Sequence, residues 1–403
     1  LIILLPKKRI DMDTKKLRQK ILDLAIRGKL VPQDPNDEPA SVLLERIRAE
    51  KERLIKEGKI KRSKKSSSDT PHYENEVPFE VPESWEWTNV ESFTYDLQYG
   101  TSEKSSSEGD VPVLRMGNIT RIGTIDFADL VYSSNKDDIS KYALLKDDLL
   151  FNRTNSSEWV GKTAIFKLDS PAIYAGYLIR VRCILVCPDY INFVLNSSYH
   201  RDWCNSVKTD AVNQSNINAQ KLSKHLIPIP PYEEQLRIVT EAKIWMNVID
   251  KLEGDVLEFE KVISKIKSKI LDLAIHGKLV PQNKSDEPAS VLLERITRDN
   301  PHYGKLTDFP FEIPESWEWV KLGNIGKWQS GTTPSKSNSS YYKDGTIPWL
   351  NTGDLNDGII REIPKKVTEK ALAETSLRLN EAGSVCIAMY GATIGKIGIL
   401  SRK

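Results

Sequence analysis

The stretch ILDLAIRGKLVPQ, residues 21–33, returns as ILDLAIHGKLVPQ at residues 270–282. The two copies differ only at Arg27 and His276, and the run DEPASVLLERI follows each of them closely. Residues 21–47 and 270–296 are identical at 23 of 27 aligned positions. Because the copies lie 249 residues apart, they are not a solenoid repeat, which recurs every roughly 20–50 residues. The sequence therefore predicts a duplicated domain together with its connecting helix.

A heptad pattern of apolar residues precedes the second copy. Its steps alternate between four and three residues, which is typical of a helix that winds around a partner helix. Gly277 suits the left-handed conformation that ends many helices, so we expect one helix over residues 232–276, roughly 65 Å long. Gly254 weakens this helix by about 1 kcal/mol relative to alanine. The expected seam consists of Ile238, Ala242, Trp245, Ile249, Leu252, Val256, Phe259, Ile263, Ile266, Ile270 and Leu273.

The first copy follows the same plan, with a glycine stop at Gly28 and a second helix from Ala40 to about Glu57. In the second copy we expect Asp286 to cap the helix PASVLLERI. The two helical regions are predicted to pack on each other or on a shared partner as a pseudo-two-fold scaffold. Two unrelated surface helices would not explain the shared residues.

The duplication continues past the helices. PFEVPESWEW (78–87) returns as PFEIPESWEW (310–319), VPVLRMGNI (111–119) as IPWLNTGDL (347–355), and VGKTAIF (160–166) as IGKIGIL (394–400). Short β-like runs alternate with glycine, asparagine and serine turns, while the intervening loops diverge. The predicted fold class is α+β, with two repeated α/β domains joined by long coiled-coil helices. One fold with two sets of loops would bind two different targets.

The predicted organisation has six parts. Residues 1–11 form a tail that we expect not to be native, because Met12 is a sensible start and LIILL is far short of the ~20 residues that span a bilayer. A helical repeat (12–58), a basic serine-rich linker or phosphate-contacting arm (59–73), and a first domain (74–230) follow. A central helix with its helical repeat (231–300) then leads to a second domain (301–403). Measured against the first domain, the second ends early, so we expect a fragment.

Composition narrows the function classes. A net charge of +2 over 403 residues means that any surface for nucleic acid must be local. Four scattered cysteines indicate reduced thiols rather than a disulfide framework. Cys183 and Cys187 are expected to share one face of a strand, RCILVC. Together with His200 and Cys204 they match no zinc spacing, so no bound metal is expected.

Three segments carry a resemblance to a known family: NQSNINAQKLSKHLIPIPPYEEQLRIV (213–239), the PESWEW openings, and the repeated ILDLAI helices. In combination they resemble the specificity subunit of type I restriction–modification systems, over nearly the whole chain from Met12. The resemblance implies two target-recognition domains on helical spacers, each reading one half of a bipartite site in double-stranded DNA. Whether the shorter second domain reads DNA alone, or is completed by another chain, stays open.

The resemblance also implies partners. Modification (methyltransferase) subunits and a restriction (endonuclease and translocase) subunit would dock on this chain in the cytoplasm. S-adenosylmethionine, ATP and Mg²⁺ would belong to those partners, so this chain is expected to bind no cofactor and to catalyse nothing by itself.

Each apparent catalytic motif in the sequence lacks a residue or a position that its chemistry requires, which supports the expectation that this chain catalyses nothing. IPPY (229–232) resembles the motif of DNA adenine methyltransferases, but Ile229 cannot accept a hydrogen bond from the target amine. We expect its prolines to end a strand and start a helix instead. GKT (161–163) lacks the first glycine of a phosphate-binding loop. Asp189 with Glu241 and Lys243 imitates a nuclease core, but the latter two fall on the long helix.

Base edges are read mainly by arginine, asparagine and glutamine, whereas contacts to phosphate set the register. Candidate side chains cluster on corresponding stretches of the two domains, and the alternative for each is an exposed polar side chain satisfied by water or by a turn. The DNA-binding candidates are Arg115, Asn118, Arg121, Asn152, Arg153, Asn155 and Lys162 in the first domain, and Asn351, Asp354, Tyr390 and Lys396 in the second.

Two rival readings remain. The chain could be the recognition region of a single-chain restriction–methylation enzyme, or a coiled-coil assembly protein that binds protein or glycan rather than DNA. A gel shift with duplex DNA at several salt concentrations distinguishes the DNA-binding reading from the assembly protein, because DNA binding weakens steeply as salt rises.

Overall fold

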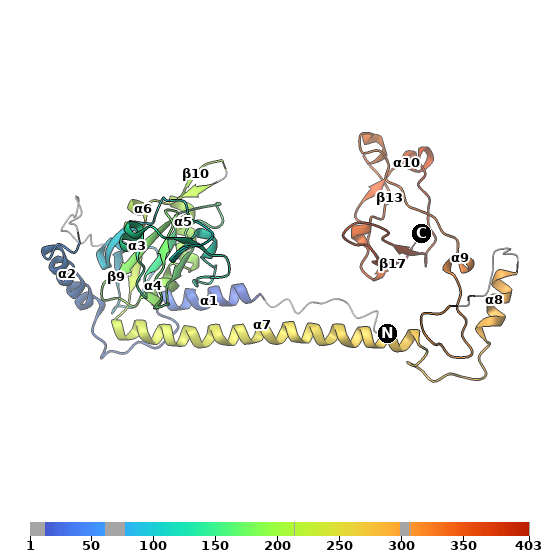
Figure 1. Cartoon of the computed structure of the whole chain (residues 1–403), viewed down its shortest axis with the longest axis horizontal. Coiled ribbons are helices and arrows are strands. Elements are labelled where there is room, and N and C mark those ends of the chain that lie inside the picture. The colour runs from blue at the N-terminus through green and yellow to red at the C-terminus, as the bar shows by residue number, and fades with distance from the viewer. Residues whose placement is uncertain (1–12, 61–76, 213, 299–305, 307, 403) are drawn as a thin grey trace. The chain divides into compact units, whose positions relative to one another are not determined.

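The computed structural model of the chain describes residues 13–60, 77–212, 214–298, 306 and 308–402. The chain divides into two units, one ending at Val256 and the other beginning at Leu257. Helices and sheets occur in both, which confirms the α+β class (Figure 1). The expected tail, residues 61–73 of the expected linker, and residues 301–305 lie outside the described residues. Among the helices that are described, none has the length and apolar character to cross a bilayer.

Two helices open the first unit, α1 (Thr14–Ile26) and α2 (Ala40–Lys56). Asp13 caps α1 by accepting a hydrogen bond from the backbone of its first turn. The helix ends before Gly28, whose φ of +64° confirms the predicted glycine stop. A Cβ atom on Gly28 would lie 2.4 Å from Cγ of Pro82. The end of α1 is therefore in direct contact with the segment that opens the following domain.

The domain that follows is built on small sheets. Its largest sheet has the order β2-β9-β5-β7 and is antiparallel throughout. Another has the order β4-β3-β8, with β3 and β8 parallel. Two smaller sheets, β10-β11-β6 and β1-β12, complete the set in the described part of this unit. The elements are β1 (Glu86–Asn89), η2 (Val90–Phe93), β2 (Thr94–Tyr99), β3 (Val111–Leu114), η3 (Met116–Asn118), β4 (Val131–Ser133), α3 (Lys136–Tyr142), β5 (Leu149–Asn152), β6 (Thr154–Asn155), β7 (Thr163–Ile165), β8 (Ile173–Tyr174), β9 (Leu178–Cys183), α4 (Pro188–Val194), α5 (Ser198–Val207), β10 (Thr209–Asp210), β11 (Ser215–Asn216), α6 (Ala219–Ser223) and β12 (Leu226–Ile229).

Strand β5 carries apolar side chains on both faces of the four-stranded sheet. Leu149 and Phe151 belong to a core that also includes residues of α1 and α2, whereas Leu150 belongs to a second core with Tyr174. This follows from the two-residue period of a strand. Because a hydrophobic core packs on each face of the sheet, the strands that carry the loop between β5 and β7 are held in place on both sides.

The prediction that RCILVC is one strand is wrong. Strand β9 ends at Cys183, Leu185 adopts a positive φ of 53°, and Cys187 is the N-cap residue of α4. Pro188 explains the change, because proline donates no hydrogen bond to a sheet but is favourable in the first turn of a helix. The two cysteines therefore share no strand face.

Helix α7 runs unbroken from Tyr232 to Ile275, within one residue of the predicted span. It starts directly after Pro230 and Pro231, as expected for IPPY, and ends before Gly277, whose φ is +65°. Its 44 residues extend over roughly 66 Å at ~1.5 Å per residue. The boundary between the two units lies inside this helix.

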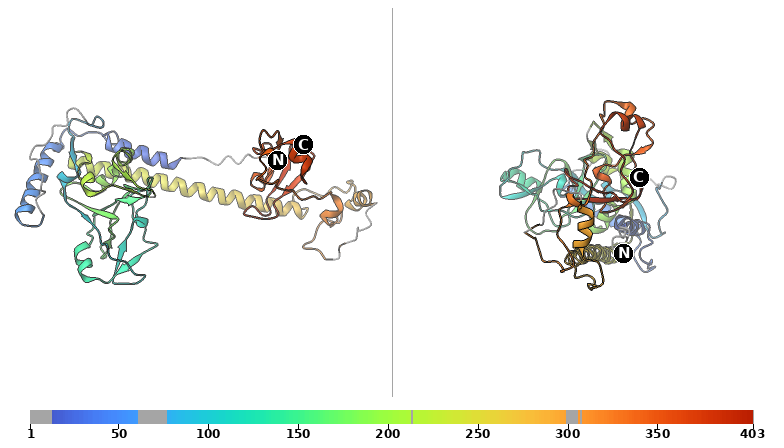
Figure 2. Two further views of the ribbon diagram at one scale, coloured as in Figure 1. Left: turned by 90° about the horizontal axis from the view of Figure 1, so that it is seen from above. Right: turned by 90° about the vertical axis from the view of Figure 1, so that its right-hand side faces the viewer.

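The heptad seam of α7 is buried over its first part. Ile238, Ala242 and Ile249 are buried, and the last two pack with Ile21 of α1. Both views show α1 lying along this part of α7 (Figures 1 and 2). Coiled-coil pairing of the later part stays a prediction. From Leu252 onward the residues of the seam are either exposed (Leu252, Phe259, Ile266) or half-buried (Val256, Ile263, Ile270, Leu273). Trp245, earlier in the seam, is also exposed.

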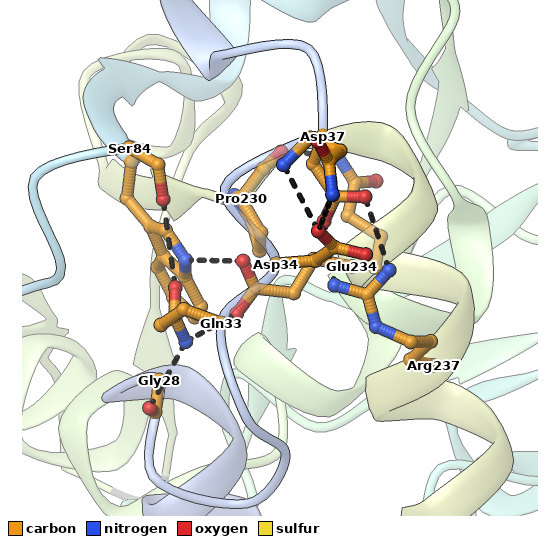
Figure 3. A network of polar contacts seen from close by, with 11 residues as sticks. Gly28, Gln33, Asp34, Asp37, Ser84, Pro230, Glu234 and Arg237 are labelled. Atoms are coloured by element: carbon orange, nitrogen blue, oxygen red, sulfur yellow. Dashed lines mark hydrogen bonds and ion pairs between the residues drawn. The ribbon is translucent and has the colours of Figure 1, made fainter.

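A polar network joins the loop after α1 to the first turn of α7 (Figure 3). The carboxylate of Glu234 is buried and accepts hydrogen bonds from the indole N–H of Trp85 (3.0 Å) and the amide of Gln33 (2.7 Å). Burial raises the pKa of Glu234, and these two donors oppose that shift. One turn later, Arg237 forms a two-pronged ion pair with Asp37 (3.1 and 2.5 Å). The network fastens the start of α7 to the N-terminal helices.

The second unit is described from the end of α7 onward. Its core contains Leu355, Ile360, Ala388 and Leu400. The described sheets are β13-β15 and β14-β17-β16, in which β14 and β17 are parallel. The elements are α8 (Ala289–Thr297), α9 (Leu322–Ile325), η4 (Ser339–Tyr341), β13 (Ile347–Pro348), η5 (Thr352–Asp354), β14 (Gly358–Ile360), β15 (Lys366–Val367), α10 (Glu369–Glu374), β16 (Val385–Ile387) and β17 (Ile397–Leu400).

The prediction that Asp286 caps α8 is wrong. The N-cap residue is Pro288, and no side chain bonds to the first turn. The carboxylate of Asp286 instead accepts a hydrogen bond from the amide of Asn283 (3.0 Å). Short polar side chains often bind their own loop in this way rather than a helix end.

Candidate nucleic-acid interface

The β5–β7 hairpin carries most of the candidates of the first domain. Its strands pair Leu149 with Ile165, and beyond them the loop is closed by two backbone hydrogen bonds. Asn152 donates to the carbonyl of Lys162, and Gly161 donates to the carbonyl of Asn152, both at 2.8 Å. Gly161 adopts a φ of +90°. This closure brings the two ends of the loop 153–160 together, where strand β5 ends and strand β7 begins.

The β16–β17 hairpin of the second unit has the same closure. Ala388 donates to the carbonyl of Lys396 (2.9 Å), and Gly395 donates to the carbonyl of Ala388 (2.8 Å). Gly395 adopts a φ of +83°. The sequence match between residues 160–166 and 394–400 therefore corresponds to one local geometry, although the loops it closes differ in length and composition.

A second loop also has the same form in both units. The side chain of Asn118 accepts a hydrogen bond from the backbone N–H of Arg115 (2.8 Å), and that of Asp354 accepts one from Asn351 (2.8 Å). Asn118 is buried and donates to two further backbone carbonyls. Both N–H groups of the Asn118 amide are therefore engaged within its own loop, and its contact to a base stays a prediction.

Trp159 brings two of the predicted cations together. The guanidinium of Arg121 lies 3.5 Å from the centre of its ring, and the ammonium of Lys162 lies 4.2 Å from it. The ammonium of Lys162 also donates to the carbonyl of Ile119 (2.6 Å). Burial, and then the charge of Arg121, lower the pKa of Lys162 to about 8. Lys162 therefore ties the loop after η3 to the hairpin loop.

The exposed candidates are those that a ligand could reach. The side chains of Arg115 and Arg121 are 39% and 44% exposed and form ion pairs with Asp129 and Glu158, respectively. In the second unit Tyr390 is 74% exposed and Lys396 is also exposed. The half-buried candidates are Arg153, Asn155, Asn351 and Asp354. The guanidinium of Arg153 lies 4.7 Å from the centre of the Tyr99 ring.

Asn152 is fully buried, and neither polar atom of its side chain has a hydrogen-bond partner. A base could not reach it without movement of the loop. Its role as a direct base contact stays a prediction that requires such movement.

The candidates predicted from the sequence did not include Trp159 or Tyr99. Trp159 and Tyr99 each support a predicted cation. The run EWVGK, with an aromatic residue close to a lysine, was the signal that could have identified Trp159, because arginine and lysine are attracted to the face of an indole ring.

The apparent nuclease residues do not form one site. Lys243 does reach Asp189 (2.8 Å), which also pairs with Lys167 (2.6 Å). Glu241, however, accepts a hydrogen bond from Trp245 on the same helix (2.8 Å). Glu241 and Lys243 are two positions apart on α7, and side chains with that spacing do not point to the same side of a helix. Ile229 of the IPPY motif is buried in strand β12.

The sequence of the chain is similar to that of proteins of known family. Over residues 99–253 and 314–403 the chain matches the family described as Type I restriction modification DNA specificity domain. It is 30% identical over 387 residues to the type I restriction enzyme EcoAI specificity subunit of Escherichia coli, covering 80% of this chain but only 64% of that subunit. It is also 30% identical over 340 residues to the putative type I restriction enzyme MjaX specificity subunit of Methanocaldococcus jannaschii, covering 80% of this chain and 74% of that one.

A solved structure is also similar in part. A chain from work on complex assembly and conformational transition of the type I R-M system has a TM-score of 0.41 and 18% identity over 66% of this chain and 60% of its own length. A TM-score of 0.41 is too low to establish a common arrangement.

Proposed function

The chain belongs to the type I restriction–modification DNA specificity family, and we propose that it reads DNA sequence for such a system without catalysing a step itself. The double-stranded DNA, the modification subunits and the restriction subunit are its proposed partners, in the cytoplasm. S-adenosylmethionine, ATP and Mg²⁺ would be bound by those partners. The observation that carries the proposal is a hairpin of the same geometry in both units, closed at Gly161 and at Gly395 beneath loops of different sequence.

The two units are proposed to be copies of one recognition domain. The paired closures of the hairpins and the paired loops at residues 115–118 and 351–354 support this. A shared framework with different loops is the expected design for reading two different half-sites. Backbone near the open Gly117 and Gly353, where a Cβ would meet nothing within 4 Å, could approach a phosphate closely.

Arg121 is the proposed DNA contact that is easiest to test. It is exposed, held over Trp159, and belongs to the loop joined to the hairpin by Lys162. We expect Arg121→Gln to weaken binding of duplex DNA by about tenfold at low salt, and to reduce the slope of log affinity against log salt by about one. Fluorescence anisotropy with a labelled random duplex, titrated at several salt concentrations, measures both.

The matched control is Lys146→Gln. Lys146 is also an exposed cation paired with a carboxylate, Asp169, but it lies before β5, at the opposite end of that strand from the loop. Its replacement should leave affinity and salt slope unchanged. Equal losses for both variants would mean that only the overall charge matters, and the assignment of this loop to DNA would then be wrong.

Helix α7 is proposed to set the distance between the half-sites. Seven residues inserted after Lys261, where the helix surface is exposed, would lengthen it by roughly 10 Å and keep its apolar pattern in phase. We expect the gap in the methylated sequence to grow by about three base pairs at ~3.4 Å each. Mapping of methylated sites with the reconstituted complex measures the gap. An unchanged gap would contradict a spacer role, and insertion of seven residues at the exposed 335–337 loop serves as the control.

A further inference from the structure

Asn152, at the end of β5, carries a buried amide. Its side chain is fully buried, and among the described residues neither its oxygen nor its nitrogen has a hydrogen-bond partner. Asn118 and Asn192, which are also buried, both donate to backbone carbonyls. A buried polar group without a partner destabilises the folded state, because it has given up its hydrogen bonds to water. Asn152 is therefore unfavourable for the stability of the free domain.

The hairpin itself does not require an asparagine at this position. In the β16–β17 hairpin, which has the same closure, Ala388 makes the two backbone hydrogen bonds that Asn152 makes in the first unit. Ala388 is 1% exposed, so a small apolar side chain fills that position. Because the closure uses backbone atoms, the amide of Asn152 contributes nothing to it. The loss of stability at Asn152 therefore needs a reason outside the framework of the hairpin.

The loop after η3 packs on the face of the sheet that carries the Asn152 side chain. Asn152 is paired across the sheet with Leu178, and cross-strand partners point to the same face. Leu178 belongs to the same hydrophobic core as Ile119, the first residue after η3. The ammonium of Lys162 donates to the carbonyl of Ile119 (2.6 Å). The loop that carries Arg121 is thus fastened over this face by Lys162.

Lys162 holds the loop at a contact that a phosphate group can replace. Its ammonium is half-buried between the carbonyl of Ile119 and the ring of Trp159. Burial lowers the pKa of Lys162 to about 8, so the charged form is less favourable there than in water. A phosphate oxygen is a charged acceptor, and hydrogen bonds between ionised partners are roughly twice as strong as neutral ones. A DNA backbone bound at Arg121 would therefore draw Lys162 away from Ile119.

We propose that DNA binding opens the contact between Lys162 and Ile119, and that the amide of Asn152 then reads an adenine of the first half-site. Its oxygen accepts from N6 of the adenine while its nitrogen donates to N7, the two-bond match that asparagine makes with this base. Asn152 has this role only if the chain reads DNA as proposed above. The hydrogen bonds that are missing in the free domain are formed with the base, so one residue lowers stability and supplies specificity.

Hydrogen exchange of the free full chain tests whether the amide is unfavourable there. Asn152→Leu keeps the number of side-chain heavy atoms and removes the polar groups, so the slowest amides of β5 and β7 should exchange about fivefold more slowly. Asn152→Ala copies Ala388 but leaves a small cavity, so exchange should stay within about twofold of the wild type. Asn118→Leu is the matched control. It leaves the backbone groups that Asn118 bonds without that partner, and exchange should accelerate about tenfold.

Selection from DNA tests the reading of adenine. The full chain is mixed with a pool of duplexes that have a randomised core, and the bound duplexes are sequenced. We expect the wild type to enrich a motif with one adenine whose preference falls about tenfold in Asn152→Leu and Asn152→Ala, while the other positions keep theirs. Lys146→Gln, which lies before β5, should keep the whole motif.

Three results would count against this role of Asn152. An unchanged motif in both Asn152 variants would overturn it. Markedly faster hydrogen exchange in both variants would also overturn it, because the amide would then be satisfied in the free chain, for example by a buried water. A wild-type chain that enriches no motif would refute DNA reading itself, and the role of Asn152 with it.

Discussion

Acidification from pH 7 to pH 4 is expected to destabilise the first domain by about 3 kcal/mol through His200 alone. His200 is buried, with Nδ1 3.0 Å from Nε2 of His225 and Nε2 3.0 Å from the carbonyl of Gly161. Burial lowers the pKa of His200 to about 4, and burial together with the charge of His200 also lowers the pKa of His225. Each unit of pKa corresponds to about 1.4 kcal/mol.

The direction follows from proton uptake. Unfolded histidine titrates near pH 6.5, above its folded pKa, so the unfolded state binds more protons in the interval between them. The stabilisation is complete above about pH 6.5 and is lost as the pH falls through about 4. Urea unfolding at half-unit pH steps, followed by tryptophan fluorescence, measures it. His200→Gln should be less stable at pH 7 yet lose less on acidification, and an unchanged pH slope in that variant would show that other groups cause the loss.

Gly161→Ala is expected to destabilise the same domain by about 3 kcal/mol. At a φ of +90° a side chain is strained by about 1–2 kcal/mol, and its Cβ would lie 2.3 Å from the sulfur of Cys204. Relief of that overlap requires movement in a packed core, at a further cost of about 1–3 kcal/mol. Hydrogen exchange of the β5 and β7 amides should accelerate by about a hundredfold.

The second unit supplies the matched control. Gly395 has nearly the same φ, +83°, but a Cβ there would meet nothing within 4 Å. Gly395→Ala should therefore cost only the backbone strain, about 1 kcal/mol, with roughly fivefold faster exchange in β16 and β17. Adding Cys204→Ala to Gly161→Ala should recover part of the loss. If the two glycine variants lost equal stability, the contact with Cys204 would not contribute.

Local patterns in the sequence predicted the elements whose causes are local. The span of α7 follows from its seven-residue repeat and from Gly277, and the start at Tyr232 follows from the two prolines. The partner of each seam residue is not encoded in that repeat. Ile249 meets Ile21 of α1, whereas Phe259 is 55% exposed in the same helix.

The candidate site was predicted as a region rather than residue by residue. The loops around Arg121 and Lys162 do meet, at Trp159. Asn118 looked like a reader of adenine because asparagine suits that base. Its side chain instead closes its own loop. Such a capping contact depends on the backbone turn between Arg115 and Asn118, which composition alone does not reveal.

The connection between the first domain and α7 is rigid. Pro230 and Pro231, whose rings fix φ, separate strand β12 from α7. The side chain of Gln235 then bridges the junction, donating to the carbonyl of Pro230 and accepting from the N–H of Cys187. Strand β12 and helix α7 must therefore move together, so a force that bends α7 would be transmitted to the sheet that β12 forms with β1.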